Sequence, residues 1–251
     1  MTAIPQGRRR RAALVSAICA LVVTGTGLTA CGSGDPDAGT NGVGKLPAGT
    51  IESRTRAAAK SASALRLSGT VVGNGGSYTL DMRLKSDGGT GSVTSKSGSF
   101  KVLRVGPHLF LKAGADFWNQ EGADGGGGDS AAAANKLEGK YVKVPTGDPA
   151  YKRFSGFTDK DVLLDSLLTL HGSLGTDGHH EQDGIRTIRI TGDKGSGGTL
   201  DVSLEGTPYP LSLVRAGNAG TLRMSDWGKD FSLAEPPKKE TVDYGKQLPA
   251  S

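Results

Sequence analysis

Few side chains of this 251-residue chain stand at the spacings that catalysis requires. The sequence contains no Gly-x-Ser-x-Gly pattern, and no serine stands three residues before a lysine, which excludes the usual serine-nucleophile frameworks of esterases and penicillin-binding enzymes. No Gly-Lys pair is followed by serine or threonine, so a phosphate-binding P-loop is absent, and so is the zinc-protease pattern His-Glu-x-x-His. We therefore expect that the protein is not an enzyme.

The densest group of side chains that could bind a metal ion lies between Asp177 and Asp183 and contains His179 and His180. Adjacent histidines point in different directions unless the chain bends, so a zinc site would need a tight turn and a third ligand, for example Asp177 or Asp183. The simpler interpretation is a solvated hairpin loop. We therefore expect no metal and no other cofactor.

Both cysteines of the chain, Cys19 and Cys31, lie near the N-terminus. A basic run from Arg8 to Arg11 and a mostly apolar run from Ala12 to Gly27 precede Cys31, which is the arrangement of a secretory signal peptide. The apolar run has 16 residues and falls short of the roughly 20 that a membrane-spanning helix needs. The sequence therefore predicts a signal peptide over residues 1–30.

The last residues of this segment, Leu28-Thr29-Ala30-Cys31, resemble the lipobox of bacterial lipoproteins. The resemblance implies cleavage between Ala30 and Cys31 and attachment of a diacylglyceryl group to the Cys31 thiol. Two acyl chains attach a protein stably to a membrane, whereas a single acyl chain gives only weak and reversible binding. A plain signal peptide cut at another position is the alternative. We expect a lipid-anchored protein on the outer face of the cell membrane, exported by the general or the twin-arginine route.

Cleavage before Cys31 would change the charge of the chain. The whole chain carries a formal net charge of +5, but residues 1–30 hold four of its 30 basic residues and none of its 25 acidic ones. A mature chain with a net charge of about +1 gives no electrostatic argument for a nucleic-acid partner. It would also hold no thiol besides Cys31, which excludes disulfides and thiolate metal sites. Stability must then come from a hydrophobic core.

From residue 65 onward, apolar residues recur with a period of two. In residues 78–84, for example, Tyr, Leu, Met and Leu alternate with polar residues, which predicts a strand with one buried and one solvated face. Glycine-rich turn signals separate further segments of this kind at hairpin spacing. The predicted strands cover residues 67–72, 78–84, 91–95, 100–105, 109–112, 140–144, 185–191, 199–205, 211–215 and 221–225.

The remaining segments divide the chain into parts. Residues 31–49 have the glycine-rich composition of a flexible tether, and Thr50 can cap a helix from Ile51 to about Leu65. Further helices are predicted at 129–137 and, more apolar, at 161–170. We expect one domain over residues 50–235 and a loose tail over residues 236–251.

Roughly nine to eleven antiparallel strands with a few helices must either close as a barrel or curl around the helices. The apolar helix in the middle of the element order favours the second arrangement. We therefore predict an α+β fold in which a curved antiparallel β-sheet, a half-barrel, carries helices over its concave face.

Several features together resemble the LppX/LprG lipoproteins. They are the lipobox, the glycine-rich tether, the alanine-rich first helix, the segment FTDKDVLLDSLL at 157–168 and the following DGIRTIRITG at 183–192. These proteins are membrane-anchored lipid carriers of the cell envelope, related in shape to the LolA and LolB carriers. The resemblance covers most of residues 50–235. It implies a LolA/LppX-like fold that binds and transfers acylated lipids or glycolipids in an apolar cavity, without catalysis.

The alternating apolar faces provide the candidate lining of such a cavity. The lining residues would be Leu80, Met82, Leu163, Leu167, Ile188, Ile190, Leu200, Val202, Leu211, Leu213, Leu222 and Met224. The same faces would serve a packed core equally well, and the sequence does not separate the two. The alternative function is therefore a non-catalytic envelope lipoprotein that holds no ligand and whose surface recruits another envelope protein.

Overall fold

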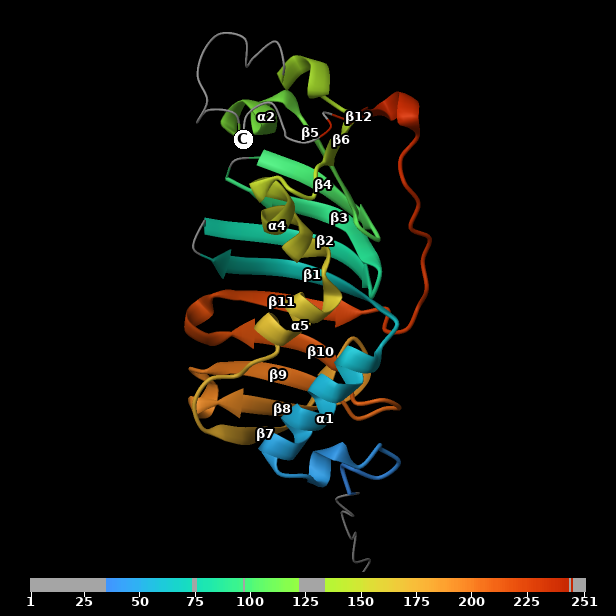
Figure 1. Ribbon diagram of the computed structural model, residues 1–251. Coiled ribbons are helices and arrows are strands. Elements are labelled where there is room, and N and C mark those ends of the chain that lie inside the picture. The colour runs from blue at the N-terminus through green and yellow to red at the C-terminus, as the bar shows by residue number, and fades with distance from the viewer. Residues whose placement is uncertain (1–34, 74–75, 97, 122–133, 244, 246–251) are drawn as a thin grey trace, which may run out of the picture. The chain divides into compact units, whose positions relative to one another are not determined.

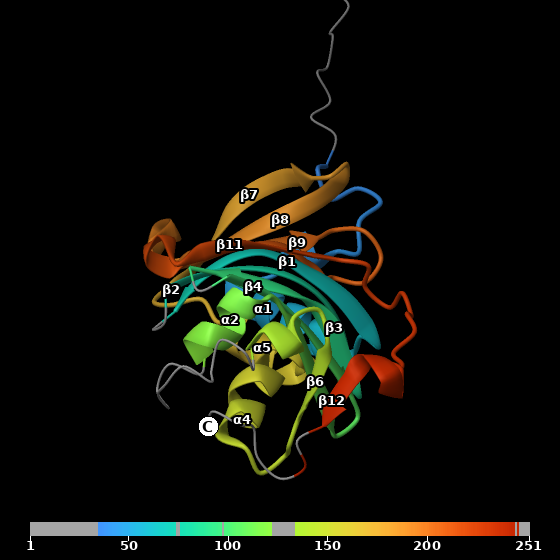
Figure 2. The ribbon, with the colours of Figure 1, turned by 90° about the horizontal axis from the view of Figure 1, so that it is seen from above.

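The computed structural model describes residues 35–73, 76–96, 98–121, 134–243 and 245. Their main feature is a 12-stranded β-sheet in the order β12-β6-β5-β4-β3-β2-β1-β11-β10-β9-β8-β7 (Figure 1). Neighbouring strands are antiparallel except β12 and β6, which are parallel. The sheet curves, and helices lie on its concave side (Figure 2). The predicted α+β fold with a curved sheet is confirmed.

The element bounds agree with most of the sequence predictions. The strands are β1 (Ala64–Gly73), β2 (Gly76–Lys85), β3 (Gly88–Ser95), β4 (Gly98–Val105), β5 (His108–Ala113), β6 (Tyr141–Val144), β7 (Leu174–Gln182), β8 (Ile185–Gly192), β9 (Gly198–Ser203), β10 (Pro210–Arg215), β11 (Gly220–Ser225) and β12 (Thr241–Asp243). The helices that bear on the site are α1 (Ala48–Ser61), α2 (Ala115–Glu121), α4 (Pro149–Ser155), the 3-10 helix η3 (Gly156–Thr158) and α5 (Lys160–Leu167). Each predicted strand is present, and the structure adds β7 and β12.

Strand β1 joins the two halves of the sheet. It pairs with β2, its neighbour in sequence, and with β11, which lies near the end of the chain. Leu67 of β1 therefore stands between Met82 of β2 and Met224 of β11, and all three side chains are buried. Because cross-strand neighbours share a face, this register brings apolar side chains from both halves of the chain onto one continuous surface.

The helices cover this surface in succession. Helix α1 packs over β7, β8 and β10, whereas η3 packs over β2, β3 and β4. Helix α5 contacts both α1 and η3, and α2 packs on β4. Figure 2 shows the helices inside the curve of the sheet. The concave side is therefore a layer of short helices on a sheet.

Helix α1 begins and ends earlier than predicted. Pro47 is its N-cap residue, so Thr50 lies in the first turn and does not cap the helix, and Leu65 belongs to β1. The buried positions follow a spacing of three and four residues, as expected for one helical face: Ala48, Ile51, Thr55 and Ala59. Since most of these side chains are small, the helix backbone can lie close to the sheet.

The segment before α1 packs on the domain, although the sequence predicted a flexible tether over residues 31–49. The backbone N–H of Asn41 donates to the Leu204 carbonyl (2.8 Å), and its side-chain amide donates to the carbonyls of Ser203 and Gly206 (both 3.0 Å). Val43 is only 2% exposed and belongs to the hydrophobic core. The tether prediction is therefore wrong for residues 35–49, and residues 31–34 lie outside the described part of the chain.

We expect that replacing both Asn41 and Val43 with alanine lowers the free energy of unfolding by about 2–4 kcal/mol. The double variant loses a buried aliphatic side chain and two long-range hydrogen bonds. Urea unfolding of the full chain measures the effect. The control is Lys45→Ala, which removes an exposed ion pair to Asp35 and should leave the stability nearly unchanged. An unchanged double variant would restore the tether interpretation.

The C-terminal segment also departs from the predicted loose tail over residues 236–251. After β11 the chain runs past the ends of β2–β5, and β12 then pairs in parallel with β6 (Figure 1). Asp243 of β12 also forms an ion pair with Lys143 of β6 (3.1 Å). The tail prediction is therefore wrong for residues 236–243, which extend the sheet by one strand. Residues 244 and 246–251 lie outside the described residues.

Candidate functional site

The concave face of the sheet is the candidate lipid site, and the structure brings most of its predicted lining together. Ten of the twelve residues are buried members of one hydrophobic cluster: Leu80, Met82, Leu167, Ile188, Ile190, Leu200, Val202, Leu213, Leu222 and Met224. The register explains the grouping, since Ile188 lies opposite Val202 and Ile190 opposite Leu200. Sequence periodicity therefore selected the buried face of these strands.

The other two predicted residues lie differently. Leu163 of α5 is only partly buried and packs against the cluster. In β10, Pro210 pairs with Val202 of β9, and Ser212 pairs with Asp201, the neighbour of Val202. Two steps along β10 therefore match one step along β9, so Leu211 is the extra residue of a β-bulge. A bulge interrupts the alternation of faces on which the prediction depended. The structure therefore leaves Leu211 outside the buried cluster.

The cluster is closely packed in this conformation. Met82, Ile190, Leu200, Val202 and Leu222 have no solvent-accessible surface. A side chain that lined a space large enough for a water molecule would retain some accessible surface, so these five side chains contact protein on all sides. Acyl chains could reach them only if the helices moved away from the sheet.

One end of the concave face is aromatic. The Phe100 ring of β4 lies 5.0 Å from Phe117 of α2, 5.2 Å from Phe154 of α4 and 6.1 Å from Phe157 of η3, measured between ring centroids. Such tilted and edge-to-face pairs add specific geometry to apolar burial. These rings come from three separate parts of the chain, around residues 100, 117 and 154–157, so no local pattern in the sequence groups them.

Polar contacts tie helix α1 to helix α5. The Lys160 side chain is only 3% exposed, and its Nζ donates to the Lys60 carbonyl at the end of α1 (2.9 Å) and to Asp161 Oδ1 (2.8 Å). Arg56 of α1 donates from Nη1 to Thr169 Oγ1 (2.9 Å), just beyond α5. Both helices meet the sheet through apolar side chains, which impose little directional preference. The polar contacts therefore orient the two helices relative to each other and not relative to the sheet.

Arg104 fixes the neighbouring η3 segment to strand β4. Its Nε donates to Thr158 Oγ1 (3.0 Å) and its Nη2 donates to the Thr158 carbonyl (2.9 Å). Thr158 is fully buried, so these bonds satisfy polar groups that water cannot reach. The helical cover over β2–β4 is therefore attached by charge-assisted hydrogen bonds.

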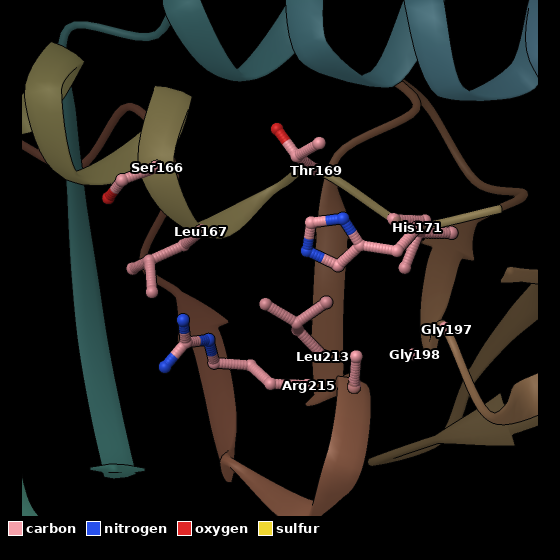
Figure 3. A pocket seen from close by; sticks show the side chains of 10 residues that line it. Ser166, Leu167, Thr169, His171, Gly197, Gly198, Leu213 and Arg215 are labelled. Atoms are coloured by element: carbon pink, nitrogen blue, oxygen red, sulfur yellow. The ribbon is translucent and has the colours of Figure 1, made fainter. Parts of the chain in front are cut away.

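A pocket of about 70 Å³ lies between the end of α5 and strand β10 (Figure 3). In this view the side chains of Leu167, Thr169 and His171 lie on one side, and those of Leu213 and Arg215 lie on the other. Leu167 and Leu213 also belong to the hydrophobic cluster. The pocket therefore has polar walls and a floor that is continuous with the apolar core.

Two glycines bring the His171 wall of this pocket close to the sheet. The His171 N–H donates to the Gly197 carbonyl (2.9 Å). A Cβ atom at Gly197 would lie 1.9 Å from the His171 carbonyl oxygen, and one at Gly192 would lie 2.3 Å from it. Only glycine permits this approach of two backbones. The pocket has no local signature in the sequence, because its parts meet through this tertiary contact.

The histidine pair lies in strand β7, so the prediction of a solvated hairpin loop over residues 177–183 is wrong for residues 177–182. His179 lies opposite Ile188 and His180 opposite Thr187, so the two side chains are on different faces of β7. His179 Nε2 lies 3.1 Å from Asp37 Oδ1. Among the described residues, no group of three or more His, Cys, Asp or Glu side chains could hold a metal ion.

The membrane anchor depends on residues that the structure does not describe. Ala30, Cys31 and the preceding signal peptide lie outside the described residues, so lipidation of Cys31 stays a prediction. Within the described part of the chain, each helix is too short or too polar to cross a membrane.

Comparison with known proteins shows what the fold of this chain is similar to. No protein-family model and no curated protein matches the sequence. The crystal structure of LprF from Mycobacterium bovis matches with a TM-score of 0.52 and 16% identity, over 75% of this chain and 96% of LprF. The Mycobacterium tuberculosis lipoprotein LppX matches with a TM-score of 0.42 and 14% identity, over 74% of this chain and 97% of LppX.

At 16% identity, the match to LprF is evidence of a shared fold. The chain therefore has the fold of LprF, in agreement with its resemblance to the LppX/LprG lipoproteins.

Proposed function

We propose that this protein is a membrane-anchored extracytoplasmic lipoprotein that binds acylated lipid or glycolipid between its curved sheet and the helices over the concave face. One observation carries the proposal. The apolar cluster runs along the concave face through both halves of the sheet and includes side chains of α1 and α5. The LprF fold and the lipobox at Cys31 support the same function.

In this proposal, acyl chains enter by separating the helices from the sheet. The contacts that a helix would lose, such as those of Ile51 and Leu164, are apolar and non-directional. Acyl chains can replace them without leaving a polar group unpaired. Since Lys160 and Arg56 join α1 to α5, we expect these two helices to move together. A bound lipid would select the open arrangement through the additional apolar area that it buries.

The second candidate function is an envelope lipoprotein that recruits another protein and holds no ligand. The complete burial of Met82, Ile190 and Val202 favours it, because a permanently packed core leaves no space for acyl chains. The two functions differ in one measurable quantity, the lipid that accompanies the folded protein.

Mass spectrometry of an organic extract tests the proposal. We expect that the full chain, purified from membranes in mild detergent and then denatured in solvent, releases acylated lipid in near-stoichiometric amount. The covalent anchor on Cys31 would stay with the protein, so it does not contribute to the extract. The control is the same protein unfolded and washed before extraction. Equal lipid in the two extracts would reject the carrier and leave the interaction lipoprotein.

A further inference from the structure

We propose that the pocket between the end of α5 and strand β10 binds the anionic head group of an acylated lipid, whose acyl chains then lie beneath α5. The inference depends on the proposed lipid-binding function and adds the class of lipid to it. The ligand would be an amphiphile that carries an oxyanion, either a phosphate ester or a carboxylate.

Arg215 provides the positive charge of the pocket. Its Nη1 donates to the carbonyls of Val72 (3.1 Å) and Ala219 (3.3 Å), and these two bonds orient the guanidinium. In the part of the chain that the structure describes, no carboxylate forms an ion pair with Arg215. A guanidinium has five N–H donors, and both bonds use Nη1, so the donors on Nε and Nη2 remain. This group suits the paired oxygens of a phosphate or carboxylate.

The other polar residues of the pocket do not compete for that role. The Ser166 hydroxyl donates to the Leu163 carbonyl (2.9 Å), and the Thr169 hydroxyl donates to the Asp165 carbonyl (3.2 Å). Both hydroxyl protons are therefore already donated to backbone carbonyl oxygens. The exposed ring of His171 lies beside them and can provide a second donor to an anion (Figure 3).

Neighbouring carboxylates are directed to other partners. Asp165 Oδ1 lies 3.7 Å from Arg56 Nη2, and Asp165 Oδ2 lies 4.0 Å from Lys60 Nζ. Asp193 Oδ1 accepts a hydrogen bond from the backbone N–H of Ser173 (2.8 Å). Neither residue lines the pocket. The residues that line the pocket therefore include no carboxylate that would offset the charge of Arg215. This positive charge favours anionic ligands over neutral ones.

The floor of the pocket explains why the ligand would be an amphiphile and not a free anion. Leu167, Leu170 and Leu213 line the pocket and are also buried members of the hydrophobic cluster. A ligand whose head group lies at Arg215 would have its apolar part directed at the boundary between α5 and the sheet. That boundary is the one that must open to admit acyl chains.

Binding of three lipids to the full chain tests the proposal. The probes are phosphatidylglycerol, oleate and a neutral diacylglycerol, each incubated with the protein and separated from it by gel filtration. We expect one or both anionic probes to bind at least about tenfold more tightly than diacylglycerol, as charge-assisted hydrogen bonds allow. Preference for phosphatidylglycerol would identify a phosphate site, and preference for oleate would identify a carboxylate site.

The Arg215→Gln variant should lose this preference and keep its affinity for diacylglycerol. Glutamine keeps an uncharged polar side chain but is too short to make the Nη1 bonds to the Val72 and Ala219 carbonyls, so thermal unfolding checks that the fold is kept. Arg223→Gln is the matched control, because Arg223 lies on the exposed side of the next strand, where it pairs with Asp183. Equal binding of all three probes, or a preference that survives in Arg215→Gln, would overturn the head-group site alone. Binding of none of them would overturn the lipid carrier as well.

Discussion

Val202→Trp is expected to lower the free energy of unfolding by about 1–3 kcal/mol or more. Val202 has no solvent-accessible surface, and it lies between Ile188 of β8 and Pro210 of β10 on the concave face. An indole at this position must displace neighbouring side chains or the helices above them. Urea or thermal unfolding of the full chain measures the loss, and lipid recovered from the same preparation should fall because the ring occupies space that acyl chains need.

Val214→Trp is the matched control for this variant. Val214 lies on the adjacent strand β10, where it is 37% exposed, so the indole can extend into solvent. The control should stay within about 0.5 kcal/mol of the wild type. A Val202→Trp variant as stable as this control would mean that the concave face borders open space, contrary to the packing described above.

Cys31→Ser is expected to abolish membrane attachment of the mature protein. The lipobox resemblance assigns the diacylglyceryl group to the Cys31 thiol, and a serine hydroxyl does not replace that thiol. The two acyl chains would be lost together, and with them the anchoring that two chains provide. Cell fractionation should find the variant in the medium or as an uncleaved precursor.

Cys19→Ser serves as the control, since it removes a thiol from within the predicted signal peptide and leaves the lipobox intact. It should remain attached to the membrane like the wild type. A Cys31→Ser protein that is fully processed and still retained on the membrane would exclude Cys31 as the anchor and require another mode of attachment.

Strands with one apolar face could be predicted from the sequence, because alternation with a period of two is a local property. Residues 78–84 and 199–205 show it clearly, and they correspond to β2 and β9, neither of which is an edge strand. Strand β7 shows no such alternation, since Leu174 is its only aliphatic residue larger than glycine, and its bulge near Gly178 interrupts the pairing. It is an edge strand, where charged and polar side chains discourage pairing with another chain, and this polar composition makes it resemble a loop in sequence.

The candidate site was less predictable than the strands, because it depends on contacts between distant segments. The pairing of β1 with β11 brings Leu67 beside Met224, and no local pattern encodes that register. Arg215 has the sequence context of an ordinary strand residue. Its role in the pocket follows from the approach of the His171 backbone to Gly197, which is a tertiary contact between two loops.

The packing of residues 35–47 on the domain limits how far a lipidated protein could move from its membrane. Only residues 32–34 would separate Cys31 from Asp35, the first described residue. A fully extended chain spans at most about 3.6 Å per residue, so the Cα atoms of Cys31 and Asp35 could be no more than about 14 Å apart. Such a domain could exchange lipid with the leaflet that holds its own anchor, but it could not cross the envelope to a second membrane. Onward delivery would then require an acceptor that comes to the anchored protein.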